Sequence, residues 1–192
     1  MSDVIPDDAL GDRNQLVVPP SEQDHWQGSL NARVVLVEYG DYQSPECSEL
    51  YTSIQTIQNQ FEATSLGRGS LCFIFRHFPQ AQIHPQAQKA AAATEAAAAQ
   101  GQFWQMHEML LKHQQELEDG CLVEYADNLG LDVTQFMRDI AQKVHINRIN
   151  ADIESGYQSG VESAPALFIN GIRYTDRWTV EQIMAAIVAA SK

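Results

Sequence analysis

The 192-residue sequence is poor in basic residues and has no long apolar run. Its 12 lysines and arginines are outnumbered by 25 aspartates and glutamates, which gives a formal net charge of −13. Nucleic acids and anionic membranes are bound by basic surfaces, so this charge argues against both as partners. No apolar run approaches the roughly 18 to 20 residues that a membrane-spanning helix needs.

Cysteine is also scarce, with only Cys47, Cys72 and Cys121 in the chain. An odd number in a chain of this length does not indicate a disulfide framework. The first residues carry neither the basic nor the apolar segment of a secretory signal, and we therefore expect a reducing, cytoplasmic location. The composition, 44% hydrophobic and 19% charged, predicts an ordered globular fold.

The first part of the chain alternates strand and helix patterns. Residues 1–28 have no sustained period and are predicted to form an extended N-terminal arm. Within residues 29–84, the apolar runs 34–37 and 71–75 are each typical of a buried strand. Between them, apolar residues recur at intervals of three and four from Cys47 onward, which predicts a helix. Strand, helix and strand at this spacing predict a βαβ unit with parallel strands.

The middle of the chain is predicted to be helical. Residues 85–160 open with an alanine-rich stretch, whose composition has high helix propensity. Asp132 and Gln135 have the spacing of a capping box, in which the first side chain caps the helix that follows. We expect a helical insertion over the whole of this segment.

The last part, residues 161–192, returns to strands. The run 166–169 predicts a buried strand, and Asn170-Gly171 after it is a strong signal for a hairpin turn into residues 172–174. A capping box beginning at Thr179 then opens an amphipathic final helix. The predicted order is βαβ, a helical block and ββα.

This order, together with several local motifs, resembles the DsbA-like thiol–disulfide oxidoreductases of bacteria, which have a thioredoxin fold. The resemblance covers about residues 19–190 and implies an α/β fold: a mixed sheet with an inserted helical domain. The motifs that carry it are Val37–Gln43, Arg76–Pro79, His84–Pro85, Gln100–Trp104, Met106–His107, Ser159–Val161 and Phe168–Gly171.

One departure from the family affects its chemistry. The family has a Cys-Pro-x-Cys motif, whereas this chain has Ser44, Pro45, Glu46 and Cys47 at the same place. In a dithiol site the first thiolate attacks a disulfide and the second thiol resolves the mixed disulfide. Serine cannot form an S–S bond, so we expect the chain to be redox-inactive or monothiol through Cys47. The same residues also make a favourable helix start, which is the purely structural interpretation of the motif.

The resemblance implies further site residues. Glu38 stands where the family has an acid that moves the proton of the second cysteine; the alternative is an acid that reaches solvent at the end of a strand. Pro165 stands where the family has a cis-proline facing the motif, and the backbone of Ala164 would pair with a bound peptide. Pro45 and Glu46 would line the same substrate surface.

Three functions remain open at this stage. The first is a thiol–disulfide oxidoreductase blocked at Ser44, with protein or peptide thiols and disulfides as partners. The second is a glutathione transferase similar to the kappa class, in which the Ser44 hydroxyl would bond the glutathione thiolate. The third is a non-enzymatic module that binds extended peptides. No cofactor is expected beyond glutathione as a thiol partner, and the oligomeric state is left open.

The sequence predicts no metal site. His77 and His84 could approach one another, but local hydrogen bonding is the favoured interpretation of both. His107 and Glu108 do not form a zinc-protease motif, because Leu111 stands where the second histidine is needed.

Overall fold

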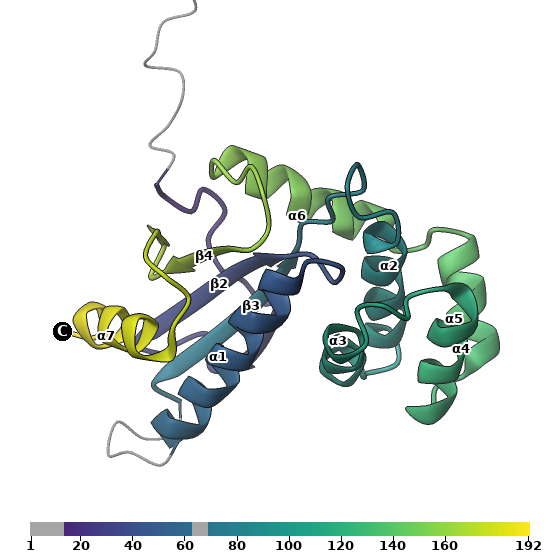
Figure 1. The fold of residues 1–192 in the computed structure, drawn as a ribbon, viewed down its shortest axis with the longest axis horizontal. Coiled ribbons are helices and arrows are strands. Elements are labelled where there is room, and N and C mark those ends of the chain that lie inside the picture. The colour runs from purple at the N-terminus through teal and green to yellow at the C-terminus, as the bar shows by residue number, and fades with distance from the viewer. Residues whose placement is uncertain (1–13, 63–68) are drawn as a thin grey trace, which may run out of the picture.

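The structure, a computed structural model, describes residues 14–62 and 69–192. Five strands form one mixed sheet in the order β1-β3-β2-β4-β5 (Figure 1). Central β2 and β3 are parallel, as the sequence predicts, and the remaining neighbours are antiparallel. The strands are β1 (His25–Gly28), β2 (Val34–Gly40), β3 (Leu71–His77), β4 (Ala166–Ile169) and β5 (Ile172–Tyr174).

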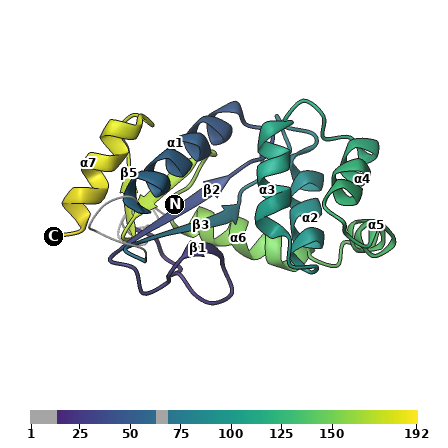
Figure 2. The ribbon, with the colours of Figure 1, turned by 90° about the horizontal axis from the view of Figure 1, so that it is seen from below.

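Helices cover both faces of this sheet. On one face lie α1 (Pro45–Glu62) and α7 (Val180–Ala190), and on the other lies α6 (Ile146–Gln158) (Figure 2). The period of two along a strand assigns each side chain to one of these faces. In β2, Leu36 packs in the cluster beneath α1, whereas Val37 and Tyr39 pack in the cluster on the α6 side. Glu38 therefore belongs to the α1 face.

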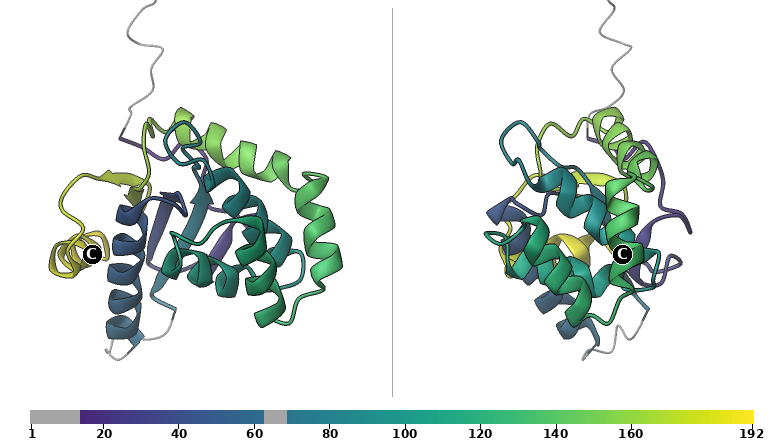
Figure 3. Two further views of the ribbon diagram at one scale, coloured as in Figure 1. Left: turned by 45° about the vertical axis from the view of Figure 1, so that its right-hand side comes forward. Right: turned by 90° about the vertical axis from the view of Figure 1, so that its right-hand side faces the viewer.

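Five helices separate β3 from β4. Besides α6 they are α2 (Ala87–Ala98), α3 (Phe103–Lys112), α4 (Asp119–Asn128) and α5 (Val133–Ala141). Figure 3 shows α2 to α5 grouped beside the sheet, with α6 leading back across it. Buried alanines in α2, such as Ala90 and Ala93, carry only a methyl group and allow its neighbours to approach closely. The predicted cap is confirmed, since Asp132 accepts a hydrogen bond from the Gln135 N–H.

The predicted hairpin and final helix are also confirmed. Asn170 and Gly171 have φ angles of 48° and 81°, the left-handed values that a two-residue hairpin turn requires. They join β4 to β5 in register, with Ile169 opposite Ile172. The Thr179 side chain accepts a hydrogen bond from the backbone N–H of Gln182 and so caps α7.

The N-terminal segment contributes to the sheet. Positions 1–13 of the expected arm lie outside the described residues. Within the rest, Gln15 forms an isolated bridge with Ile172, and β1 adds an edge strand antiparallel to β3. No helix in the described ranges combines the length and the apolar character needed to cross a membrane.

Candidate functional site

The Ser44 turn lies where β2 passes into α1. Pro45 is the first residue of α1, as expected of a proline after a capping serine. Pro45 and Glu46 are exposed, whereas Ser44 is only 1% exposed. Two loop contacts hold the turn from outside: the Gln114 side-chain amide donates hydrogen bonds to the carbonyl oxygens of Ser44 (2.7 Å) and Tyr42 (3.0 Å).

The Ser44 hydroxyl is engaged within the turn. It donates a hydrogen bond to Oε2 of Glu46 at 3.0 Å. The pKa of the Glu46 carboxyl is lowered, first by a hydrogen bond from its own backbone N–H and then by this hydroxyl. A negative charge is therefore favoured at the exposed N-terminus of α1, where the helix dipole also stabilises it.

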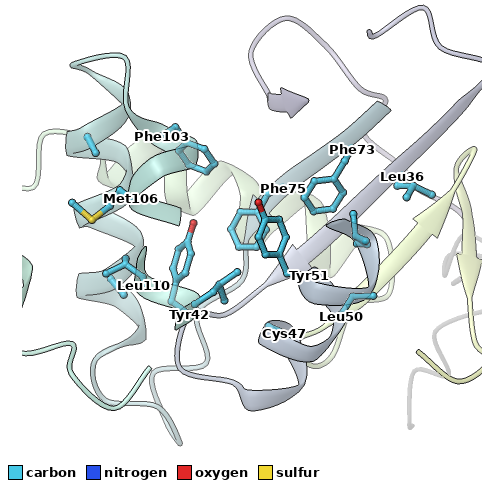
Figure 4. Close-up of a cluster of buried hydrophobic side chains, with 14 of the residues drawn as sticks. Leu36, Tyr42, Cys47, Leu50, Tyr51, Phe73, Phe75, Phe103, Met106 and Leu110 are labelled. Atoms are coloured by element: carbon cyan, nitrogen blue, oxygen red, sulfur yellow. The ribbon is translucent and has the colours of Figure 1, made fainter. Parts of the chain in front are cut away.

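Cys47 is buried beneath the turn. Its side chain is fully buried, and Figure 4 places it with Leu36 and Leu50 in the apolar cluster between α1 and the sheet. The backbone N–H of Asp41 donates a hydrogen bond of 3.3 Å to its sulfur. Burial, followed by the nearby Glu38 carboxyl, raises the pKa of the thiol well above its ordinary value. Cys47 is thus held as a neutral thiol.

Glu38 is buried on the same face of the sheet. It is 0% exposed, so the alternative of an acid that reaches solvent is wrong. Neither carboxyl oxygen has a hydrogen-bond partner in the described part of the chain, and burial raises the pKa of the group to about 8. Its carboxyl also contributes to the raised pKa of the Cys47 thiol. A carboxyl that titrates near neutrality beside a buried thiol can take up and release a proton, and its relay role stays a prediction.

The sheet register brings Pro165 to this site. Ala166 pairs with Tyr39, so the residues before β4 lie at the end of β2 from which the chain runs to Ser44. The Ala164–Pro165 peptide bond is cis, as the resemblance implies, and both residues are half-buried. The backbone N–H of Ala164 donates a hydrogen bond of 3.1 Å to the side-chain oxygen of Gln80. In this arrangement Gln80 occupies the donor that a bound peptide would use.

Asp41 organises the loops around the turn, a role that the sequence analysis missed. Its buried carboxylate accepts hydrogen bonds from the backbone N–H groups of Gln43 (2.7 Å) and Gln80 (2.8 Å). Nδ1 of His84 lies 2.9 Å from the same carboxylate. The only available signal was the position of Asp41 between a buried strand and a proline-containing turn.

His77 and His84 do not face each other. His84 contacts Asp41, whereas Nε2 of His77 lies 2.9 Å from the Glu95 carboxylate. His25 of β1 joins His77 and Glu95, and these three form the one group in the described chain with ligand atoms close enough for a shared metal ion.

The family follows from a comparison with known proteins. Residues 20–189 match the model of a protein family described as thioredoxin. The chain belongs to this thioredoxin family. Its structural neighbours are DsbA-like thiol–disulfide oxidoreductases. BdbD from Bacillus subtilis in its oxidised form superposes with a TM-score of 0.78 at 19% identity, over 93% of this chain and 98% of BdbD. The thiol-disulfide exchange protein alpha-DsbA2 from Wolbachia pipientis gives a TM-score of 0.70 at 22% identity, over 88% and 87% of the two chains.

Curated relatives of this thioredoxin-family chain carry a different name. A protein named Na(+)/H(+) antiporter NhaA 3 from Salinispora tropica is 36% identical over 176 residues, which are 91% of this chain and 26% of the antiporter. The chain therefore spans about a quarter of the length of the curated relatives it matches.

Proposed function

We propose that this chain is a DsbA-type thiol–disulfide exchange domain whose dithiol cycle stops at Ser44, and that it binds extended protein or peptide clients without turning them over. One observation supports the proposal: Cys47 is fully buried. By the resemblance it is the one sulfur left in the motif, with Ser44 where the family has its nucleophilic cysteine. Ion transport is not part of the proposal, because the match covers only about a quarter of each antiporter. The cytoplasmic location stays a prediction.

Exchange chemistry needs a reachable thiolate. A thiolate attacks one sulfur of a disulfide and forms a mixed disulfide, while the other sulfur leaves as a thiolate. The Ser44 hydroxyl cannot take this part. Cys47 is kept protonated by its raised pKa and is covered by the first turn of α1, which argues against a monothiol cycle in the folded chain.

The contacts of Ser44 also disfavour the glutathione transferase alternative. The hydroxyl that would bond a glutathione thiolate donates instead to the Glu46 carboxylate. An incoming thiolate would have to displace that carboxylate and stand close to its negative charge, which is unfavourable. If conjugation of glutathione to a chlorinated aromatic were detected and then lost in Ser44→Ala, this alternative would replace our proposal.

The client surface is proposed to run between the α1 N-terminus and the residues before β4. Pro45 and Glu46 are exposed on one side, and Ala164 and Pro165 are partly exposed on the other. An extended peptide pairs through backbone hydrogen bonds, and the Ala164 N–H is the donor available for this once Gln80 releases it.

Reduction of insulin disulfides by dithiothreitol tests the blocked cycle. The chain as it stands should give the background rate, and Ser44→Cys should accelerate reduction. Ser48→Cys is the matched control, because it adds a thiol to α1 outside the motif and should leave the rate at background. The proposed block of the dithiol cycle would be refuted if the unmodified chain accelerated insulin reduction, or if a folded Ser44→Cys sample gave only the background rate.

Client binding needs a separate measurement without disulfide chemistry. Insulin B chain with alkylated cysteines, carrying a fluorescent label, can be titrated with the chain and followed by fluorescence anisotropy. We expect saturable binding that unlabelled B chain displaces. Absence of saturable binding, both in this chain and in Gln80→Ala, would remove the client-binding part of the proposal.

A further inference from the structure

Two imidazoles and a carboxylate meet at the end of β3 that adjoins the Ser44 turn, where β1, β3 and α2 each supply one side chain. Nε2 of His25 lies 2.7 Å from Oε1 of Glu95, and Nε2 of His77 lies 2.9 Å from the same oxygen. One potential ligand atom from each side chain lies within 4.8 Å of the others. We call these three residues the His–His–Glu cluster.

The sheet register explains why the cluster forms. His25 pairs with Phe75, so their side chains share the face of the sheet that packs under α2 and α3. His77 stands two residues beyond Phe75 on the same strand and therefore on the same face. Glu95 is a buried residue of α2, which packs against this end of the sheet. Three elements thus each supply one donor.

The surroundings hold the donors in place. The His25 ring stacks on Phe103, with 3.6 Å between the ring centroids and 9° between the planes. His77 is fully buried, and its Nδ1 has no hydrogen-bond partner in the described chain. The hydrogen-bonding capacity of His77 is therefore concentrated on Nε2, the atom that faces the other two donors.

The charge of the cluster suits a cation. Glu95 is 5% exposed, and Nε2 of both imidazoles lies within hydrogen-bond distance of one of its carboxylate oxygens. A divalent cation is attracted to a carboxylate in such a buried place, and the net charge of the chain acts in the same direction.

The donor set selects the class of metal. Two imidazole nitrogens and one carboxylate oxygen suit zinc and similar transition metals, whereas calcium and magnesium prefer all-oxygen sites. Three protein ligands leave a fourth position for water. The His25 side chain is 19% exposed, so this position can open towards solvent on the β1 side.

We propose that His25, His77 and Glu95 bind one divalent transition metal ion of the zinc class and so clamp edge strand β1 to helix α2. The metal takes the place of the hydrogens that now lie between the two imidazoles and the carboxylate. A neutral ring then carries its hydrogen on Nδ1, and only a ring that was protonated releases a proton to solvent. The three donors move slightly apart, because ligand atoms around a tetrahedral zinc ion are separated by more than a hydrogen-bond length.

Calorimetric titration of the untagged full chain with zinc chloride tests this site. The protein is first stripped with a chelator and kept reduced, in a Cys121→Ser background that removes the half-exposed thiol. We expect one ion per chain and a rise in the thermal midpoint that excess chelator reverses. Cobalt(II) should give the visible absorption of nitrogen and oxygen ligands without a thiolate charge-transfer band.

Matched variants separate a metal site from a network of hydrogen bonds. His25→Gln removes an imidazole at the half-exposed edge and should weaken zinc binding by about tenfold or more. His113→Gln removes an exposed histidine that pairs with Glu116 and contacts the Tyr125 ring, neither of which belongs to the cluster, and should leave binding unchanged. Glu95→Gln keeps the shape of the ligand without its charge, and it should also weaken binding.

The proposal is overturned if stripped protein binds no zinc, or if His25→Gln and His113→Gln bind it equally. It is also overturned if His25→Gln lowers the thermal midpoint in the absence of metal while zinc raises the midpoint of neither protein. That last result would assign the cluster a purely structural role. Because His25→Gln changes an edge position, the test does not depend on whether Glu95→Gln folds.

Discussion

The Ser44 hydroxyl donates a hydrogen bond of 3.0 Å to the Glu46 carboxylate across the first turn of α1. The Ser44 hydroxyl is consequently paired within the turn, and the Glu46 carboxylate places a negative charge at the exposed edge of the turn. Cys47, the third residue of α1, is fully buried in the folded chain. The engaged hydroxyl and the buried thiol are the two features on which the proposed block of the dithiol cycle rests.

The three thiols should differ sharply in reactivity. Cys121 is half-exposed, whereas Cys47 and Cys72 are buried and burial raises the pKa of both. With Ellman's reagent we expect about one thiol per native chain and all three in denaturant. Cys121→Ser should abolish the native reaction. Rapid labelling of Cys47 in that variant would show that the α1 N-terminus opens, and would revive the monothiol alternative.

Glu38 should make stability depend on pH. Its pKa rises from 4.5 to about 8 on folding, so between these values the folded chain binds a proton that the unfolded chain does not. Stability attributable to this group should fall as pH rises from 4.5 to 8 and then level off, by a few kcal/mol in all, since one pKa unit corresponds to about 1.4 kcal/mol.

Urea denaturation of the chain and of Glu38→Gln, from pH 5 to pH 9, measures this effect. The unfolding free energy of Glu38→Gln should increase relative to that of the unmodified chain as pH rises. Glu38→Leu should remove the same dependence of the unfolding free energy on pH, because it also removes the titrating group. A difference that stays constant with pH would mean that Glu38 titrates normally.

Gly40 should tolerate no side chain. A Cβ there would overlap the buried ring of Phe75 and approach Oε1 of Glu38 to 3.0 Å. We expect Gly40→Ala to destabilise the chain by about 1–3 kcal/mol, the usual cost of overpacking. Gly120→Ala is the control: it lies in α4 with open space around it, and should be neutral or stabilising by up to about 1 kcal/mol. If Gly40→Ala and the unmodified chain were equally stable in chemical denaturation, the close packing around Gly40 would be contradicted.

The ion pair between Asp24 and Arg76 should be essential for stability. Nε of Arg76 lies 2.8 Å from Oδ1 of Asp24, and both side chains are at least 95% buried. Removing one partner leaves a buried charge, so Asp24→Ala should cost about 3–5 kcal/mol. Lys112→Gln breaks an exposed pair with Glu108 and should cost less than about 1 kcal/mol. Thermal and urea unfolding of the two variants provide the comparison.

Gln80 should compete with clients. Its side chain accepts the hydrogen bond from the Ala164 N–H, so Gln80→Ala frees that donor. We expect the variant to bind alkylated insulin B chain several-fold more tightly in the anisotropy titration, since one hydrogen bond contributes about 1 kcal/mol. Gln100→Ala removes side-chain hydrogen bonds to the backbone of Asp132, outside the proposed client surface, and serves as the control. Weaker binding by Gln80→Ala would mean that Gln80 itself contacts the client.

Local sequence patterns predicted most of the helices and strands. The apolar run in β2, the spacing of three and four in α1 and the Asn170-Gly171 turn are each set by neighbouring residues. The sequence also predicted that Ser44 and Cys47 lie in one turn and that Glu38 precedes them on a strand, which the structure confirms; their chemical roles stay predictions. Strand β1 escaped prediction because it is a short edge strand whose partner, β3, lies more than forty residues away.

The amino-acid sequence alone predicted the order of the elements, and it showed one cysteine in the 44–47 turn, where a serine hydroxyl cannot form a disulfide whatever surrounds it. The packing of the chain was needed to show that Glu38 is buried with no hydrogen-bond partner among the described residues and that Cys47 is fully buried. It alone brought His25 and His77 to Glu95, from three separate elements. Burial, pKa and the meeting of distant side chains depend on how elements pack across the sheet, and a pattern of near neighbours along the chain carries no record of that packing.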